Sequence, residues 1–168
     1  MDSRALRGLC EGNGRSAVMA DIKSPEERSR NMAKIRSRDT KPEEYVRKLL
    51  FGQGYRYRKN VSSVPGHPDA WLAKYNTAVF VHGCFWHRHE GCKYAYTPKS
   101  RVEFWMNKFR KNIERDNTVR KQLADRKIRS LTIWECTVKK MMKSEEEKQR
   151  VLDRIALFLV SEDATCEL

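Results

Sequence analysis

The stretch FVHGCFWHRHEGC, residues 80–92, constrains this chain more than any other part of its sequence. It places histidines, cysteines and two adjacent large aromatic residues directly behind an apolar segment that is typical of a strand. Cys84, His89 and Cys92 have the spacing C-x4-H-x2-C. Together with Cys136 of the later TIWEC segment, these residues can converge on one tetrahedral zinc ion. We therefore predict a structural zinc site that fixes this loop.

Four other residues of the same stretch are not zinc ligands in this assignment. Phe85 and Trp86 lie between the first two ligands, where a loop fixed by zinc can hold them outward and available for opening a stacked structure. His82 and His87 remain free for other chemistry beside the metal. The alternative for all four is a place in an ordinary core, with packed rings and internally satisfied histidines.

Composition indicates a polyanionic partner. In 168 residues, 35 Lys and Arg against 22 Asp and Glu give a net charge of +13, which attracts nucleic acid. The longest apolar run, residues 155–160, is far shorter than the roughly 20 residues that span a bilayer, so we expect no membrane segment. The cysteines with histidine neighbours favour metal ligation in a reducing cytoplasm over disulfides, and Cys10 and Cys166 are expected to take no part.

Capping boxes, in which a hydroxyl residue precedes glutamate by three positions, predict where the helices begin. They lie at Ser24, Thr40, Ser100 and Ser144. The first opens a short polar helix, the second a helix to about residue 52, the third a long helix to about residue 127, and the last a helix with apolar residues to 159.

Strand candidates lie between these helices, at residues 55–59, 69–73, 78–81 and 130–135, with a hairpin link at 74–77. The pattern predicts an α/β fold in which helices flank a mixed β-sheet. Residues 1–20 lack apolar periodicity and are predicted to be a disordered extension. Residues 21–160 are predicted to form a single domain, and residues 161–168 a C-terminal tail.

The segment PGHPDAWL, residues 65–72, is a second chemical feature. Two prolines and a glycine fix a turn that delivers Asp69 to the start of a strand. If the hairpin forms, this carboxylate faces the strand end that carries His82. Nuclease chemistry requires such an arrangement, because a carboxylate can hold Mg²⁺ against a phosphate while a neighbouring base deprotonates water. For Asp69 taken alone, capping of the turn is the alternative.

These motifs resemble a known family. PGHPDAW and FVHGCFWH, with EFW at 103–105, KNIERD at 111–116 and WEC at 134–136, closely resemble the very short patch repair (Vsr) DNA mismatch endonucleases. RSRNM at 28–32 and RDT at 38–40 fit as well, so the resemblance runs from about residue 21 to about residue 138. It implies a restriction-endonuclease-like core in which histidine chemistry replaces the usual second acidic residue and lysine.

The resemblance also implies catalytic residues. Asp69 matches the Mg²⁺ ligand, assisted by the main-chain carbonyl of Val81. His87 matches the histidine that activates water, and His82 the one that supports the scissile phosphate or the base. Glu43 aligns with a family glutamate near the active site, but it is also the last residue of a capping box, so a purely local function stays open.

The same comparison assigns metal and DNA contacts. Arg88 interrupts the histidine run of the family, so the match of His89 to a zinc position assumes a one-residue insertion. The implied zinc ligands are then Cys84, His89, Cys92 and Cys136. Aromatic residues that enter the duplex beside a T:G mismatch are matched by Phe85, Trp86 and Trp105, while Met32 matches a residue that closes in from the minor groove.

The resemblance therefore predicts a Mg²⁺-dependent endonuclease that nicks one strand on the 5′ side of the mispaired thymine in a T:G pair. Such mismatches arise when 5-methylcytosine deaminates. We expect a monomer that binds mismatched double-stranded DNA in the bacterial cytoplasm, at the nucleoid, with other mismatch-repair proteins as candidate partners. The alternative is a zinc-stabilised DNA- or RNA-binding module without catalysis, in which Asp69 is a turn residue and the histidines are incidental.

Overall fold

The computed structural model describes residues 24–33 and 38–168, and the chain divides into two compact units, residues 1–35 and 36–168. Helix α1 (Pro25–Ala33) belongs to the first unit and begins where the capping box predicts. The Glu27 N–H donates to Ser24 Oγ at 3.2 Å, and the Ser24 N–H donates to Glu27 Oε2 at 3.1 Å. The extension predicted at residues 1–20 lies outside the described residues.

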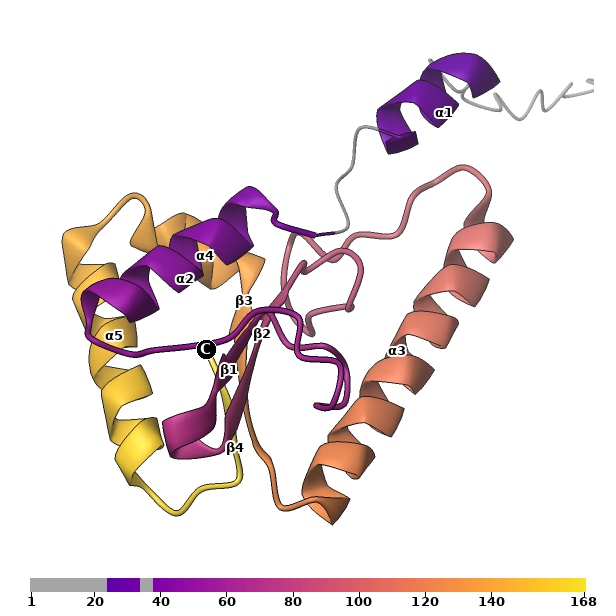
Figure 1. Ribbon diagram of the computed structural model, residues 1–168. Coiled ribbons are helices and arrows are strands. Elements are labelled where there is room, and N and C mark those ends of the chain that lie inside the picture. Colours follow the sequence, from indigo (N-terminus) through magenta and orange to yellow (C-terminus); the bar gives the residue numbers. More distant parts are fainter. Residues whose placement is uncertain (1–23, 34–37) are drawn as a thin grey trace, which may run out of the picture. The chain divides into compact units, whose positions relative to one another are not determined.

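The described residues of the second unit form a mixed sheet with the strand order β1-β2-β3-β4 (Figure 1). Strands β1 (Ala70–Leu72) and β2 (Thr77–His82) pair antiparallel through the short 3-10 helix η1 (Ala73–Tyr75), which confirms the predicted hairpin. Strand β3 (Arg129–Trp134) runs parallel to β2 and to β4 (Thr165–Glu167). The predicted mixed α/β sheet is therefore confirmed.

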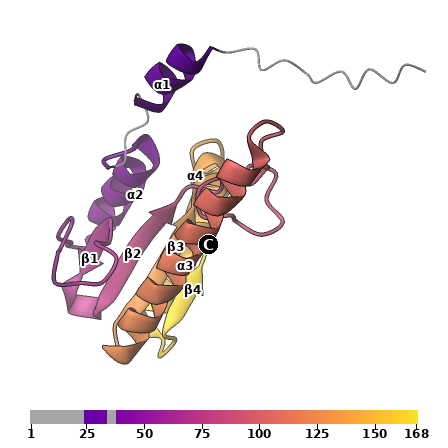
Figure 2. The same cartoon turned by 90° about the vertical axis from the view of Figure 1, so that its right-hand side faces the viewer.

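Helices cover both faces of this sheet. Figure 1 shows α2 (Lys41–Gly52), α4 (Glu135–Met141) and α5 (Glu145–Val160) on one face, and α3 (Val102–Asp125) on the other. In the view of Figure 2, turned by 90°, α3 lies in front of the strands. No helix in the described part of the chain is long and apolar enough to cross a membrane.

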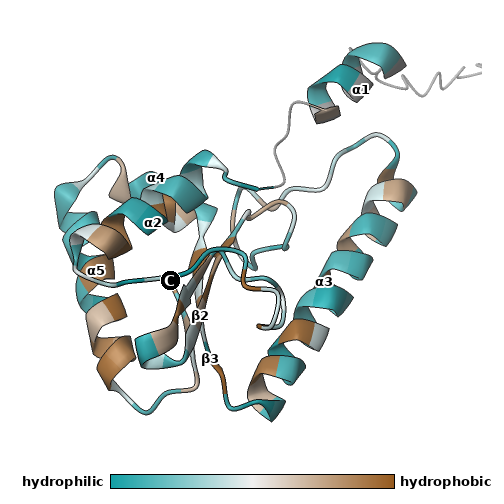
Figure 3. Ribbon diagram, in the orientation of Figure 1, coloured by the Kyte–Doolittle hydropathy of each residue, from teal (hydrophilic) through white to brown (hydrophobic). Residues whose placement is uncertain are grey.

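Alternating strand residues supply two cores. Hydrophobic residues run along β2 and β3 and recur on α5 (Figure 3). Val79 points to the larger core under α2, α4 and α5, whereas its neighbours Ala78 and Phe80 point to the smaller core under α3. The larger core contains Val46, Leu50, Leu131, Ile133, Val138, Ile155 and Phe158, and the smaller one contains Val64 and Leu123.

The register between β2 and β3 decides where the functional loops meet. The two strands are parallel, and their last residues, His82 and Trp134, are paired. The segments that follow these two residues therefore leave the sheet at the same edge. One is the predicted zinc loop, and the other is the start of α4, which carries Cys136.

Four details differ from the sequence prediction. Helix α3 starts at Val102 after Arg101 in a left-handed conformation (φ 52°), so Ser100 is not its cap. Residues 55–59 make an isolated bridge between Arg58 and Trp71 instead of a strand, because β1 is too short to offer a longer partner. The predicted strand 130–135 ends one residue early, since Glu135 begins α4. The predicted tail supplies β4, whose register places Cys166 opposite Leu131 of β3.

Candidate active site and metal centres

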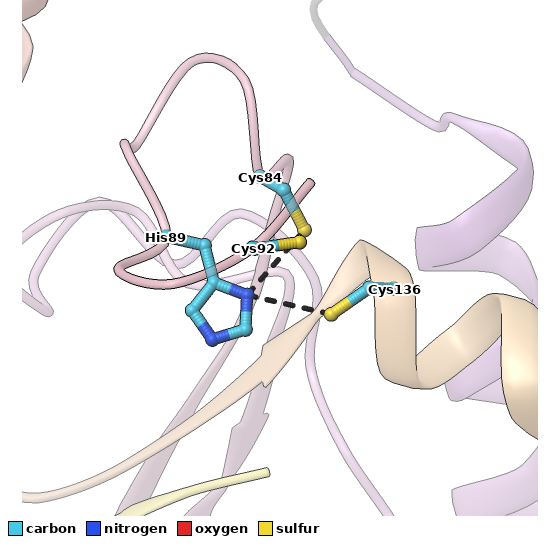
Figure 4. Close-up of side chains that lie close together, drawn as sticks. All are labelled: Cys84, His89, Cys92 and Cys136. Atoms are coloured by element: carbon cyan, nitrogen blue, oxygen red, sulfur yellow. Dashed lines mark hydrogen bonds between the residues drawn. The ribbon is translucent and has the colours of Figure 1, made fainter. Parts of the chain in front are cut away.

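The four predicted zinc ligands lie together at the shared edge of the sheet (Figure 4). Their ligand atoms lie within 4.8 Å of one another, so the set can hold a metal ion. His89 Nδ1 is 3.6 Å from Cys84 Sγ and 3.3 Å from Cys136 Sγ. Cys84 is fully buried, whereas Cys92 is half-buried. Three thiols and one imidazole are a donor set typical of structural zinc.

Backbone hydrogen bonds fold the loop around this centre. The His87 N–H donates to the Gly83 carbonyl at 3.0 Å, and the His89 N–H donates to the Cys84 carbonyl at 3.1 Å. Arg88 adopts φ 54°, a conformation that L residues rarely adopt, and this turn brings His89 back toward Cys84.

Electrostatics of the cluster favour a cation at its centre. Burial raises the pKa of the Cys84 thiol to about 12, because a buried thiolate loses its hydration. A metal ion bound there would supply the compensating positive charge, and thiolates are the form in which cysteine binds zinc.

Asp69 lies at the start of β1 with its carboxylate directed at the backbone of β2. The Val81 N–H donates to Asp69 Oδ2 at 2.7 Å. Burial raises the pKa of Asp69 to about 6, with the hydrogen bond from Val81 acting in the opposite direction. The preceding turn needs Gly66, which has φ 79°, and a Cβ there would lie 2.6 Å from Val119 Cγ1 on α3. The turn therefore packs tightly enough to fix Asp69.

His82 and His87, the histidines predicted to act in catalysis, form a stacked pair beside Asp69. Their ring centroids are 3.9 Å apart with an interplanar angle of 10°. His87 Nδ1 lies 2.6 Å from Asp116 Oδ2, and Asp116 projects from α3. Burial lowers the pKa of His82 to about 3, so its imidazole is neutral near neutral pH. Sequence reasoning gave Asp116 no function, although it is the last residue of the KNIERD motif.

One pocket of about 530 Å³ contains the predicted catalytic residues. Its lining includes Asp69, Val81, His82, His87 and Glu43, together with Asp116 and three arginines, Arg38, Arg115 and Arg120. These guanidinium groups give the pocket a rim suited to phosphate. The structure therefore brings into one cavity carboxylates, two histidines and cationic side chains, the groups that phosphodiester hydrolysis uses.

Glu43 is engaged locally as well. Its Oε1 accepts a hydrogen bond from Thr40 Oγ1 at 2.8 Å, and its Oε2 is 3.6 Å from Arg47 Nη1. Thr40 is the N-cap of α2, and Arg47 lies one turn beyond Glu43 on the same helix. Glu43 also lines the pocket, and its negative charge contributes to the raised pKa of Asp69.

The predicted DNA-contacting aromatics form a cluster between the loop and α3. The Phe85 ring centroid lies 5.1 to 5.3 Å from the rings of Trp86, Tyr96, Trp105 and Phe109. Phe85 is thus packed among other rings, not held free in solvent, because α3 lies beside the loop. Phe104 and Met106, on the same helix, are about half exposed at 49% and 53%. The side chain of Met32 lies outside the described residues.

Comparison with known proteins identifies the family. Residues 14–93 match the family model described as DNA mismatch endonuclease Vsr. The chain is 37% identical over 150 residues to the DNA mismatch endonuclease Vsr of Escherichia coli K12, which covers 89% of this chain and 94% of that protein. It is 44% identical over 137 residues to the type II nicking enzyme V.NmeAIP of Neisseria meningitidis serogroup A, covering 82% of this chain and 97% of the relative.

The chain belongs to the Vsr DNA mismatch endonuclease family. A third relative, the type II nicking enzyme V.XorIIP of Xanthomonas oryzae, is 38% identical over 135 residues, or 80% of this chain and 98% of that enzyme. As a member of the Vsr family the protein is a DNA endonuclease, a hydrolase whose partner is DNA. Membership therefore favours an enzyme over a binding module without catalysis.

Proposed function

We propose that this protein nicks one strand of duplex DNA on the 5′ side of the mispaired thymine in a T:G mismatch, in a reaction that requires Mg²⁺. The observation that carries the proposal is the convergence of Asp69, His82, His87 and Asp116 in one pocket with a rim of arginines. Deamination of 5-methylcytosine is the source of such mismatches. The protein acts as a monomer, with other mismatch-repair proteins as candidate partners.

The donor atoms around Asp69 fit Mg²⁺, which prefers carboxylate, carbonyl and water oxygens. Asp69 Oδ2 is occupied by the Val81 N–H, which orients the carboxylate and leaves Oδ1 for an ion. The carbonyl of Val81 is a second candidate ligand. Bound there, Mg²⁺ would neutralise charge that develops on the scissile phosphate. Arg115 and Arg120 line the pocket and would hold neighbouring phosphate oxygens; in their place, Arg115 now lies 3.8 Å from Asp116 and Arg120 3.1 Å from Glu167.

His87 is the general base in this proposal, and Asp116 positions it. An ionised Asp116 accepts the Nδ1 proton of His87, so Nε2 keeps its lone pair and can take a proton from water. Burial of Asp116 raises its pKa, but the hydrogen bond and charge of His87 outweigh this effect and lower it overall, which keeps the carboxylate ionised. The neutral ring of His82 stacks on His87 and restricts its rotation.

Recognition of the mismatch is assigned to the aromatic cluster. A T:G step is less well stacked than a matched step, so inserting rings there costs less of the few kcal/mol that unstacking requires. Trp86 and Trp105 are half-buried and contact each other, and Trp105 also borders the exposed Phe104. Trp86 precedes His87 on the same loop, whereas Trp105 and Phe104 belong to α3. Insertion of Trp86 and placement of the base are therefore linked through one loop.

An end-labelled duplex with one T:G pair tests the proposal. Incubation with Mg²⁺ is expected to give a single nick on the thymine strand, and the matched T:A duplex should stay intact. Asp69→Asn serves as the matched control, since it keeps the size of the side chain but removes the charge. Binding without a Mg²⁺-dependent nick would support the binding-module alternative, and cleavage of both strands would contradict the assigned reaction.

A further inference from the structure

Beside the Asp69 site lies a second group of ligand-type side chains. His82, His87 and Asp116 each offer one ligand atom, and these atoms lie within 4.8 Å of one another. The set comes from the end of β2, the loop after it and the middle of α3. It shares no residue with the cysteine cluster. Two imidazoles and one carboxylate form a three-ligand site with open coordination positions.

One atom of this group has an unmet bonding requirement. His82 Nδ1 is buried and has no hydrogen-bond partner among the described residues. A buried polar atom without a partner costs about 1–3 kcal/mol, so native structures nearly always satisfy such atoms. The neighbouring ring of His87 does not supply the missing partner, because it stacks face to face on His82 and a ring face offers no hydrogen-bonding nitrogen. A ligand that binds imidazole nitrogen would remove this cost.

We propose that His82, His87 and Asp116 form an inhibitory metal site that binds Zn²⁺ and other divalent ions with a preference for imidazole. Imidazole nitrogen suits Zn²⁺, Co²⁺, Ni²⁺ and Cu²⁺, whereas Mg²⁺ takes oxygen ligands and keeps much of its water. The two kinds of ion are therefore sorted between neighbouring sites. Asp69 and the Val81 carbonyl serve Mg²⁺, and the histidine pair serves the softer ions.

The ligand atoms of His82, His87 and Asp116 need to move only slightly to coordinate a metal ion. With bonds of about 2.0–2.2 Å, ligand atoms around a tetrahedral zinc ion are about 3.4 Å apart. His87 Nδ1 and Asp116 Oδ2 are already at 2.6 Å, so an ion would separate this pair while drawing His82 inward. The near-parallel rings mean that one imidazole must turn toward the ion. The adjoining pocket of about 530 Å³ gives it space to do so.

A metal ion bound at this site would inhibit nicking, because two of its ligands are the proposed general base and the residue that positions it; this step rests on the proposed function. An ion on this site takes a nitrogen lone pair of His87 and the carboxylate of Asp116. The base can then no longer accept a proton from water, whether or not DNA and Mg²⁺ are bound. Excess Zn²⁺ is thus expected to stop nicking without displacing the zinc of the cysteine cluster and without weakening DNA binding.

Metal counting tests the site without any activity measurement. Protein loaded with one zinc is dialysed against Co²⁺, and both metals are measured per chain, with d–d absorption reporting coordination. We expect one zinc retained and one Co²⁺ bound. His82→Ala and Asp116→Asn should each weaken Co²⁺ binding at least tenfold while the zinc remains, and zinc retention shows that each variant is folded.

Matched controls separate this site from its surroundings. His67 is exposed and lines the same pocket but is not part of the cluster, and Asp69 is the nearby carboxylate. His67→Gln and Asp69→Asn should keep the second metal. The inference is overturned if no Co²⁺ binds beyond the cysteine cluster, if His82→Ala and Asp116→Asn bind it unchanged, or if His67→Gln loses it equally.

Nicking assays then test inhibition separately. With Mg²⁺ present, nicking should fall as Co²⁺ fills the second site, with half inhibition at the Co²⁺ concentration that half-fills the site in the metal count. Nicking that continues while the site is full overturns the inhibitory function. If no nicking occurs with Mg²⁺ alone, the proposed function fails while the metal count still decides the site, so the two failures are distinguishable.

Discussion

Replacement of Asp116 by asparagine tests most directly how the active site is organised. The side chain of Asp116 accepts a hydrogen bond from His87 at 2.6 Å and is about 15% exposed. Asparagine has the same size, so packing on α3 should be kept. The substitution removes the negative charge. The new amide can also turn its N–H₂ toward His87 Nδ1, which would place the ring proton of His87 on Nε2, so that this nitrogen could no longer act as a base.

The magnitude follows from the contact that is lost. A hydrogen bond to a charged group contributes about 1.5–3 kcal/mol. If this contact stabilises the transition state, in which His87 gains a proton, its loss lowers the rate roughly 10- to 150-fold. The affinity for DNA should change little, because the substitution removes only a long ion pair, between Asp116 Oδ1 and Arg115 Nη2 at 3.8 Å, and adds no negative charge that would repel phosphate. The expected signature is a slower single-turnover rate at unchanged Kd.

The assay is single-turnover nicking of a T:G duplex at saturating Mg²⁺, with Kd measured by fluorescence anisotropy without Mg²⁺. Glu114→Gln is the matched control, since it removes the same charge from an exposed position on the same helix. A rate for Asp116→Asn within threefold of the parent would refute the positioning function. Equal losses in Asp116→Asn and Glu114→Gln would show that helix charge matters, and not the contact with His87.

Three further predictions concern the metal ligands and the aromatic cluster. Asp69→Asn should abolish nicking. Without Mg²⁺, but with the zinc of the cysteine cluster retained, it should also stabilise the fold above pH 6 by up to about 2–3 kcal/mol, measured by urea unfolding. Folding raises the pKa of Asp69 to about 6, so the ionised carboxylate destabilises the folded protein. The free energy of unfolding of the parent protein should therefore fall as the pH rises from about 4 to about 6. A profile that is flat over this range would contradict the prediction. Cys136→Ser should reduce bound zinc below one per chain in metal analysis, and unchanged zinc would remove Cys136 from the ligand set. Trp86→Ala should cost about 1–3 kcal/mol of T:G preference in competition binding with an unchanged salt slope, and an unchanged preference would move recognition elsewhere in the cluster.

Local sequence signals predicted the parts of the fold that depend on neighbouring residues. The boxes at Thr40 and Ser144 cap α2 and α5 because N-capping involves residues within one turn. The hairpin between β1 and β2 was predictable for the same reason. Three of the four cysteine-cluster residues lie within nine positions of each other, so their spacing alone indicated a metal centre.

Contacts between distant segments were not predictable from these signals. Strand β4 has three residues, two of them exposed, so it carries no hydrophobic alternation, and only its pairing with β3 makes it a strand. Asp116 is one of many charged residues on a 24-residue helix. Nothing local distinguishes it from Glu114 or Asp125, because its partner His87 lies 29 positions away. Sequence also could not show that α3 would pack beside Phe85.

The order of residues in the zinc loop has a physical consequence for catalysis. Cys84 and His89 bracket His87, so a metal ion bound to this cluster would fix the chain on both sides of the proposed base. Trp134 extends this constraint, because its ring stacks on His89 at 4.1 Å and meets His82 edge-on at 5.5 Å. The ring of Trp134 thus contacts both the cysteine cluster and the histidine pair. Loss of zinc should therefore loosen the placement of His87 even where the sheet remains folded, since the backbone–backbone hydrogen bonds of the loop, such as His87 N–H to the Gly83 carbonyl, close within it. Only side chains of α3 would then still hold this part of the loop: Asn112, which donates to the Trp86 carbonyl at 3.0 Å, and Asp116, which contacts His87.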